Sequence, residues 1–446
     1  MFTDKFQPSP AQVLVVGFLM LILVGTILLS LPMATASGEP LGPLDALFTA
    51  TSAVCVTGLV VVDTGTHFSI FGQVVIMLLI QAGGLGFMTM ATLIFLVLGK
   101  KITLKGRLVI QEALNQITLS GLVRLTKSII ILTLVIEGVA ALILGVRFSQ
   151  SADISFGQGM YMGVFHAISA FCNAGFDIMG GGVGLTLYRD DFVVNTVIMG
   201  LFIFGGLGFT VIVDIYTRGS IKKMALHSKF VLLLTSILLL VGFFGIFILE
   251  YNNPATLGEL SFIEKIMPAF FTGATVRTAG FNTIDTGALE SGTLFFMLIL
   301  MFIGASPAST GGGIKTTTFG VLLIAVYAII KGGDEVNLMR RRIPYHIVLK
   351  ALSIIVIGFV VVGLVTIILS QTEEQDFMNI FFEVVSAFGT VGLSTGITSE
   401  LTAVGKGIII VVMFMGRVGP LTLALALGRR YSKSKIRYPE ERVLVG

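Results

Sequence analysis

Long apolar runs, interrupted by short polar stretches, are the dominant pattern along this chain of 446 residues. Such runs occupy residues 11–31, 70–98, 129–144, 230–249 and 347–369. Because about 20 apolar residues are enough for a helix to cross a bilayer, these runs predict membrane-spanning helices. The first run is too long for the apolar part of a signal peptide, and we interpret it as a retained span.

Four shorter amphipathic stretches recur between the long runs, and each is too short to cross a bilayer. They read PLDALFTATSAV, MYMGVFHAISAF, FIEKIMPAFFTGAT and MNIFFEVVSAFG. Each leads into a loop with a glycine, in the segments AVCVTGLV (Gly58), AFCNAGFD (Gly175), TVRTAGFN (Gly280) and AFGTVGLS (Gly392). The glycines lie 117, 105 and 112 residues apart (58 to 175, 175 to 280, 280 to 392). This spacing indicates an internal fourfold repeat.

The repeating unit is a span, a re-entrant half-helix, a glycine loop and a second span. Both ends of each unit lie on the same side of the membrane, so the repeats are parallel. The pattern predicts an all-α integral membrane protein in which four fused repeats surround a central pore, with eight transmembrane helices and four re-entrant loops. The repeats are expected at residues 1–115, 116–228, 229–345 and 346–430, followed by a cytoplasmic tail at 431–446.

Charge is scarce and unevenly distributed. Only 12% of the residues are charged and 55% are hydrophobic, whereas soluble proteins carry about 25% charged residues. Lysine and arginine concentrate in residues 100–127, 218–229, 331–350 and 429–442, and the remaining connections are rich in acids. The positive-inside rule places the basic segments and both termini in the cytoplasm. The acidic outer face would raise the local concentration of cations.

The glycine loops predict the chemistry of the pore. Bare backbone at membrane depth is tolerated only when it is buried in protein or lines a watery cavity. Four parallel units would bring the loops together on one axis, where carbonyl oxygens can replace the hydration shell of a cation and half-helix C-termini favour positive charge. The expected ion-binding residues are Val56, Thr57, Gly58, Asn173, Ala174, Gly175, Thr278, Ala279, Gly280, Thr390, Val391 and Gly392. Carbonyls without a ring of carboxylates suit a weakly hydrated monovalent cation.

The second spans align as QAGGLGF, FGGLGF, FIGASPA and MGRVGP. In the first two copies the glycines are consistent with close helix packing. The third copy is broken by ASPASTGGGIKTTTFG, in which Pro307 disrupts the helix and a polar loop is expected over residues 305–318. GGGIKT lacks the Gly-Lys-Ser/Thr order of a phosphate-binding loop. We predict that Gly311, Gly312 and Gly313 form a gate.

Two cationic side chains, Lys315 and Arg417, are expected at the inner half of the pore. Lys315 either joins the gate or extends to the cytoplasmic surface. Arg417 lies in mid-span within VVMFMGRVGPL, where a charge indicates a functional role, and we assign it to the pore lining or to a contact with the gate loop. Glu137 is expected to pair inside the bundle. The arginines at 340–342 are either ordinary cytoplasmic charge or a docking site.

Three other residue types receive structural interpretations. Asn173 either caps its pore helix or adds an oxygen to the ion path, and Arg277 is expected to brace its loop by pairing with Glu264 or Glu383. The two cysteines stand three residues before Gly58 and Gly175 and are interpreted as packing residues. With two cysteines and four scattered histidines, the sequence contains no disulfide framework or metal-ligand spacing. No triad or pair of facing acids supports an enzyme.

The fourfold pattern resembles the Trk/Ktr/HKT superfamily of potassium transporters over nearly the whole chain, and most of all the KtrB-type membrane subunits of bacterial Ktr systems. TVGLS at 390–394 is similar to the potassium-channel filter TVGYG. In that family the four loop glycines form the selectivity filter, the broken span of the third repeat forms an intramembrane loop beneath it, and glycine rather than serine at the position of Gly58 implies potassium.

The resemblance further implies a homodimer in the bacterial plasma membrane, seated on a cytosolic ring of nucleotide-binding RCK (KtrA-like) subunits. K+ would be the transported ion at the filter loops, no cofactor would be bound by the chain itself, and no nucleic acid would be a partner. Whether Na+ acts as an activator stays open. Two alternatives remain, an ion-coupled carrier of a small solute and a less selective Na+/K+ pathway. Carriers usually have inverted repeats or two halves, so four parallel units favour a pore.

Overall fold

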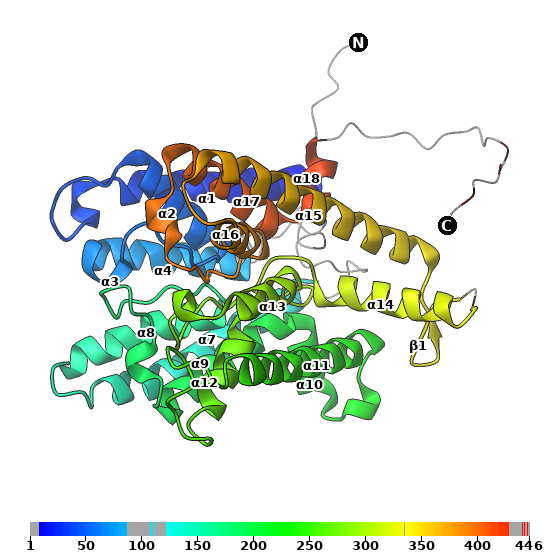
Figure 1. Ribbon diagram of the computed structural model, residues 1–446, viewed down its shortest axis with the longest axis horizontal. Helices are drawn as coiled ribbons and strands as arrows, with labels where there is room; N and C mark the ends of the chain where they lie inside the picture. Colours follow the sequence, from blue (N-terminus) through cyan, green and yellow to red (C-terminus); the bar gives the residue numbers. More distant parts are fainter. Residues whose placement is uncertain are drawn as a thin grey trace, which may run out of the picture.

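The computed structural model describes residues 9–86, 122–333 and 335–427, together with single positions at 108, 111, 439, 441 and 444. Most of the predicted basic segment at 100–127, the boundary between the first two repeats and nearly all of the tail at 431–446 lie outside these residues. Helices form almost all the regular structure of the described part, and the longest of them run roughly along the long axis of the molecule (Figure 1).

The first span of every repeat is one long apolar helix. These helices are α1 (Pro10–Leu29), α7 (Leu122–Phe148), α11 (Leu226–Leu249) and α15 (Tyr345–Thr372). All four are long and apolar enough to cross a membrane, as the apolar runs predict. The start of α1 follows from local sequence, because Ser9 and Gln12 form a reciprocal capping box around Pro10 at the first helical position.

Each first span is followed by a shorter helix that ends inside the molecule. These pore helices are α2 (Pro43–Cys55), α8 (Phe156–Phe171), α12 (Ile266–Thr275) and α16 (Phe377–Gly389). Each packs against the first span of its own repeat. All four coincide with the amphipathic stretches of the sequence, so the predicted order of span, half-helix and glycine loop is confirmed in every repeat.

The second spans are shorter helices than the first spans. They are α4 (Ile70–Leu85), α9 (Phe192–Leu207), α13 (Ser291–Phe302) and α17 (Ala403–Val418). Three of them end at a glycine with left-handed φ: Gly86 (83°), Gly208 (95°) and Gly419 (90°). Beyond Gly208 the chain continues as α10 (Phe209–Arg218) at an angle of 96° to α9. The sequence predicts a break in the third repeat alone, whereas the helices of the second and fourth repeats also end at an aligned glycine.

The third repeat differs by the length of its break. Residues 303–315 separate α13 from α14 (Thr316–Ile330), while in the fourth repeat a single glycine separates α17 from α18 (Pro420–Leu427). Short elements complete the fold: α3 (Thr64–His67), the 3-10 turns Pro32–Ala34, Thr186–Tyr188, Ile221–Lys223, Thr286–Ala288 and Ile397–Glu400, and a hairpin of β1 (Asn337–Leu338) and β2 (Arg341–Arg342). The hairpin pairs Asn337 with Arg342 and Leu338 with Arg341 in antiparallel register.

The four repeats form a closed ring. The second span of each repeat packs against the pore helix of the next, in the pairs α4–α8, α9–α12, α13–α16 and α17–α2. The last pair joins the fourth repeat to the first, and Figure 1 shows the corresponding blue and orange helices side by side. The side chain of Gln12 also donates a hydrogen bond of 3.1 Å to the Ala426 carbonyl. Parallel repeats around one axis are therefore the architecture of this chain.

Glycines of the second spans allow close contact with the pore helices. A Cβ on Gly83, Gly205 or Gly416 would collide with the backbone carbonyl of Val54, Phe171 or Phe388, respectively, at the C-terminal end of the pore helix in the same repeat. The interpretation of these glycines as packing residues is correct for the first two repeats and extends to the fourth.

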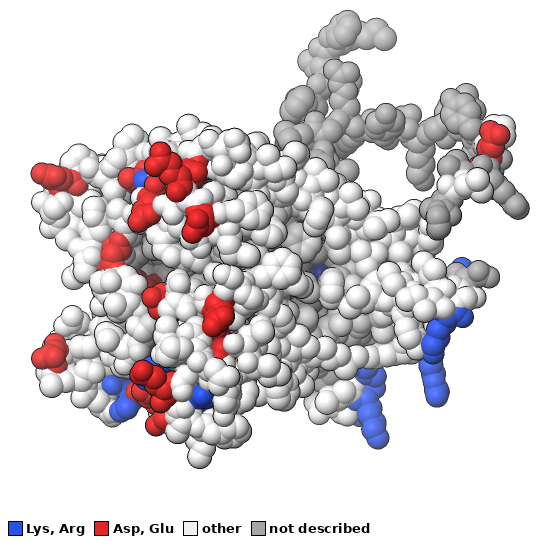
Figure 2. Space-filling view, viewed as in Figure 1, with Lys and Arg blue, Asp and Glu red and all other residues white. Residues whose placement is uncertain are grey.

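Charge is segregated along the long axis. Figure 2 shows acidic side chains gathered at the end that carries the loops around α3 and α8, and lysine and arginine side chains at the opposite end near β1 and α10. Two cations at the acidic end are paired, since Arg147 contacts Asp191 at 2.7 Å and Lys406 contacts Asp45 at 2.8 Å. This distribution agrees with the charge pattern of the sequence.

We predict that Gly205→Ala destabilises the protein, because overpacking against the Phe171 carbonyl costs about 1–3 kcal/mol. Gly200, in the same helix, is the matched control: a Cβ there meets nothing within 4 Å, and alanine gains about 1 kcal/mol in helix propensity. The measurement is the melting temperature of each purified variant in detergent. Equal melting temperatures for Gly205→Ala and Gly200→Ala would contradict this account of the helix contact.

Candidate functional site

The four glycine loops meet in a closed ring. A Cβ added to Gly58 would press on the Ala174 carbonyl of the second repeat, and one on Gly175 on the Ala279 carbonyl of the third. A Cβ on Gly280 would collide with the Val391 carbonyl of the fourth repeat, and one on Gly392 with the Thr57 carbonyl of the first. Each glycine therefore lies against the carbonyl that precedes the next glycine, and a side chain at any of these positions would break the ring.

The backbone of the ring is unusual in the same way in every repeat. The residue two before each glycine has left-handed φ although it carries a side chain, at Val56 (50°), Asn173 (58°), Thr278 (66°) and Thr390 (51°). The glycines themselves have φ of 95°, 68°, 79° and 90°. Left-handed backbone at a residue other than glycine costs on the order of 1–3 kcal/mol and clusters at functional sites. Its fourfold recurrence marks these loops as the candidate site.

The amides of the ring donate hydrogen bonds to the pore helices, whereas its carbonyls accept none from the described residues. The residue before each glycine donates its N–H to a pore-helix carbonyl, in the pairs Thr57–Ser52, Ala174–Ser169 and Val391–Ser386 at 2.8 Å and Ala279–Thr275 at 3.0 Å. Among the residues that the structure describes, none donates a hydrogen bond to the carbonyls of the eight residues one and two before the glycines. Buried acceptors are normally satisfied, so the shared lack of a donor sets these eight oxygens apart.

The surroundings of the ring favour a cation. All four pore helices end at it, with the negative ends of their dipoles directed toward the loops. Two carboxylates stand at the acidic side: Asp63, which accepts from the Gly182 amide at 2.8 Å, and Asp177, two residues beyond Gly175. Burial raises the pKa of the Asp177 carboxyl to about 6; the Met179 amide opposes this rise and the neighbouring Asp63 adds to it.

The polar loop of the third repeat lies directly against the ring. Thr310 donates its hydroxyl to the Asn173 side chain at 2.8 Å, and the Gly312 amide donates to the Thr390 hydroxyl at 3.0 Å. Gly311 packs on the Thr278 side chain. The loop therefore touches the left-handed residues of three repeats. Asn173 contacts this loop instead of capping its helix.

The backbone of this loop is satisfied by protein. The Gly304 amide bonds to the Ile314 carbonyl at 2.8 Å, the Ser306 amide to Gly206 at 3.0 Å and the Gly313 amide to Gly416 at 3.2 Å. The carbonyl acceptors belong to the second spans of the second and fourth repeats as well as to the loop itself. The last turns of those two helices therefore bind the amides of the loop.

Arg417 and Lys315 both bind the loop. The Arg417 guanidinium donates to the Thr310 carbonyl and to the carbonyls of Gly83 and Gly84 in the first repeat. It thus connects the loop to the first repeat, to which the described residues of the loop make no other hydrogen bond. The Lys315 ammonium donates to the Gly311 carbonyl at 2.7 Å. The alternative in which Lys315 extends to the surface is wrong.

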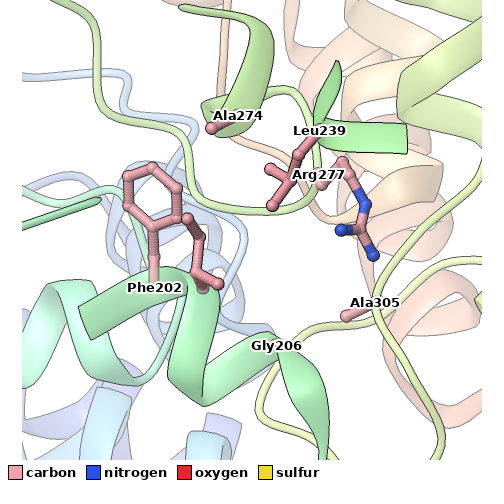
Figure 3. Close-up of a pocket in the computed structure, with 7 residues that line it drawn as sticks. Phe202, Gly206, Leu239, Ala274, Arg277 and Ala305 are labelled. Carbon is pink, nitrogen blue, oxygen red and sulfur yellow. The ribbon is translucent and has the colours of Figure 1, made fainter. Parts of the chain in front are cut away.

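The predicted partners of Arg277 are wrong. Figure 3 shows its side chain beside Leu239 and Ala305, at a small cavity also lined by Phe202, Gly206 and Ala274. Arg277 is 9% exposed, and its Nε has no hydrogen-bond partner in the described part of the chain. Glu264 is instead bonded to the Ser261 amide, and Glu383 to two hydroxyls. Sequence proximity to the loop could not reveal that both acids bond to other groups.

Two structural predictions are confirmed behind the ring. Glu137 is buried and accepts a hydrogen bond of 3.1 Å from Gln81, which joins the first and second repeats. Cys55 and Cys172 are buried free thiols.

The sequence interpretation missed three serines that hold the loops. Ser52 and Ser386 accept from the amides of Gly58 and Gly392 at 3.1 Å, and Ser169 donates to the Phe176 carbonyl at 2.7 Å. All three stand six residues before their glycine, so a residue-by-residue alignment of the repeats would have found them.

Comparisons with known proteins agree on one family. The family model TrkH, cation transport protein, matches residues 7–434. The Ktr system potassium uptake protein B of Bacillus subtilis (strain 168) is 49% identical over 98% of this chain and 97% of its own length. The protein of the same name from Vibrio alginolyticus is 41% identical over 99% of this chain and 96% of its own length. The potassium/sodium uptake protein NtpJ of Enterococcus hirae is 41% identical over 98% of this chain and 97% of its own length.

The fold comparison is consistent with these relatives. The crystal structure of the potassium transporter TrkH from Vibrio parahaemolyticus matches with a TM-score of 0.71, covering 96% of this chain and 87% of that one at 18% identity. The likeness shows a shared fold of fused pore repeats. Matched by the family model over almost its whole length and by relatives of more than 40% identity, the chain belongs to the TrkH family of cation transport proteins.

Proposed function

We propose that this chain is the ion-translocating subunit of a potassium uptake system and that the ring of carbonyls is its selectivity filter. The single observation that carries the proposal is the set of eight carbonyls, at the residues one and two before the glycines, that receive no hydrogen bond from the described residues. Such oxygens replace the hydration shell of an ion. Two relatives are named potassium uptake proteins, which supports K+ as that ion.

A less selective Na+/K+ pathway is the second candidate. The relative named potassium/sodium uptake protein, at 41% identity, favours it. Glycine at all four ring positions favours potassium, since every strand is free of a side chain that would narrow or distort the ring. Measuring uptake of 86Rb+ and 22Na+ by the protein in proteoliposomes, each in competition with K+, decides between the two candidates.

In this proposal the loop at residues 303–315 is the gate. It lies against Asn173, Thr278 and Thr390 of the filter strands, so an ion leaving the ring meets the loop first. Arg417 and Lys315 hold it there through its own carbonyls. Breaking these few hydrogen bonds would release the loop without unfolding a helix.

The remaining assignments follow from the same proposal. The basic end of the molecule faces the cytoplasm, and both termini lie on that side of a bacterial plasma membrane. The working assembly is a homodimer on a nucleotide-binding RCK ring, which moves the gate through the cytoplasmic end of α14. K+ is the cargo, Na+ is a candidate activator, and no cofactor is held by this chain. The word "system" in the names of two relatives supports a multi-component assembly.

Gly58→Ser should lower the preference for K+ over Na+. The new Cβ would press on the Ala174 carbonyl and displace one strand of the ring. We expect the uptake ratio of K+ to Na+ to fall about tenfold, which corresponds to 1.4 kcal/mol. Gly38→Ser is the control, because Gly38 also has left-handed φ (76°) but a Cβ there meets nothing within 4 Å. An unchanged ratio in Gly58→Ser would remove Gly58 from the filter.

Deleting Gly311, Gly312 and Gly313 should raise ion flux and reduce its dependence on the cytosolic partner. The shortened loop can no longer reach the Thr390 hydroxyl, which now accepts from the Gly312 amide. Initial rates of 86Rb+ uptake with and without the partner provide the measurement. If the variant reaches the membrane and keeps wild-type, partner-dependent flux, the loop is not the gate.

Arg417→Ala tests the same gate without changing the length of the chain. It removes the donor to the Thr310, Gly83 and Gly84 carbonyls, so flux in the absence of the partner should rise. Removing a mid-membrane charge also relieves a cost of about 2.5–3.5 kcal/mol on insertion scales, so the variant should be expressed well. Unchanged partner-free flux would count against Arg417 as a latch.

Uptake should increase as the external pH rises through about 6. The Asp177 carboxyl is neutral below its raised pKa of about 6 and negative above it, and only the charged form attracts cations to the mouth of the pore. The measurement is the 86Rb+ uptake rate between pH 5 and 7.5. Asp177→Asn should flatten this profile and lower uptake at pH 7.5; a variant with the wild-type profile would assign the pH effect to another group.

A further inference from the structure

Glu383 is a buried carboxylate in the pore helix of the fourth repeat. It is 0% exposed, and both of its oxygens accept hydroxyl hydrogen bonds: Oε2 from Ser394 at 2.7 Å and Oε1 from Thr398 at 2.6 Å. The two hydroxyls also contact each other at 3.0 Å. Because one buried side chain bonds to both hydroxyls, which also bond to each other, the cluster restrains the segment that follows the filter.

The cluster acts on the outer half of the fourth filter strand. Ser394 is the second residue after Gly392, and its hydroxyl accepts from the Gly396 amide at 3.0 Å. The inner half of the strand is held by a different group, since the Gly392 amide donates to the Ser386 hydroxyl at 3.1 Å. The strand is therefore fixed at two points by one helix, and the outer point depends on Glu383.

The restraint is specific to the fourth repeat. Nine residues before the other filter glycines stand Thr49, His166 and Phe271. The Thr49 hydroxyl has no hydrogen-bond partner among the described residues, and His166 bonds through Nδ1 to the Met162 carbonyl of its own helix at 2.8 Å. In those repeats, the residue nine before the glycine has no carboxyl group that could hold the outer half of the strand.

We propose that Glu383 is a positioning residue for ion selection: through Ser394 it fixes the strand that carries Thr390, Val391 and Gly392, and so sets the preference for K+ over Na+. The inference rests on the proposed role of the ring as a selectivity filter. A binding constellation has to be held within about 0.5 Å of its productive geometry by supporting contacts. Releasing one strand of four lets its carbonyls move inward, toward the shorter distances that Na+ requires.

The test compares Glu383→Gln with a matched control, Glu373→Gln, in proteoliposomes. Glu373 is also a buried carboxylate in the fourth repeat, and it accepts from the Thr402 hydroxyl at 2.7 Å and the Thr402 amide at 2.8 Å, away from the filter strand. We expect the K+ to Na+ uptake ratio to fall about tenfold in Glu383→Gln, with a raised KM for K+, and to stay at the wild-type value in Glu373→Gln.

Ser394→Ala supplies a second route to the same answer if Glu383→Gln does not fold. It keeps the carboxylate and its bond to Thr398 but removes the link to the strand. The ratio should fall in the same direction, and the double variant should be no less selective than Glu383→Gln alone, since residues in one network do not act additively.

Three results overturn the proposal, and each has a different meaning. If wild type prefers K+ and folded Glu383→Gln or Ser394→Ala keeps that preference, Glu383 does not position the filter, although the filter itself stands. If wild type shows no preference for K+ over Na+, the proposed function fails and this inference fails with it. A loss of preference in both Glu383→Gln and Glu373→Gln would also overturn the specific role of Glu383.

Discussion

The arrangement of this protein depends on keeping backbone carbonyls in the membrane interior without hydrogen-bond donors. Such groups are costly in apolar surroundings, so the fold has to hold them in place by other bonds. It does so with left-handed backbone at Val56, Asn173, Thr278 and Thr390 and with amide bonds back to the pore helices. The half-helices, the close glycine contacts of the second spans and the closed ring of repeats all serve to maintain this one strained arrangement.

Fourfold repetition gives the ring its shape, and the residues that differ between the repeats make different contacts around it. Among the described residues, only the third repeat carries the long loop, whose amides bond to Gly205, Gly206 and Gly416 of its neighbours. The fourth contributes the Arg417 latch and the Glu383 anchor. The second contributes Asn173, the side chain that bonds to Thr310. The proposed gate and the proposed filter are therefore in direct contact, and a movement of the loop would alter the polar environment of three strands at once.

Sequence patterns predict the membrane spans, the pore helices, the parallel repeat and the ring glycines, because each of these depends on hydrophobic periodicity or on recurrence within the chain. The remaining features depend on which side chains meet after folding. The solitary position of Arg277, the bond from Lys315 to Gly311 and the anchor on Ser394 join residues whose relative orientation no local pattern contains. The helix ends at Gly86, Gly208 and Gly419 could have been predicted from the sequence, since all three glycines stand in aligned positions.

The contact between α17 and α2 has a consequence for biosynthesis. Because the fourth repeat closes the ring against the first, the first filter strand has no neighbour on one side until nearly the whole chain has entered the membrane. A truncated product would hold three strands beside an open, unsatisfied flank, which hydrocarbon does not tolerate. The ring can therefore close only after the fourth repeat has entered the membrane, and until then the backbone of the first strand stays uncovered on that side.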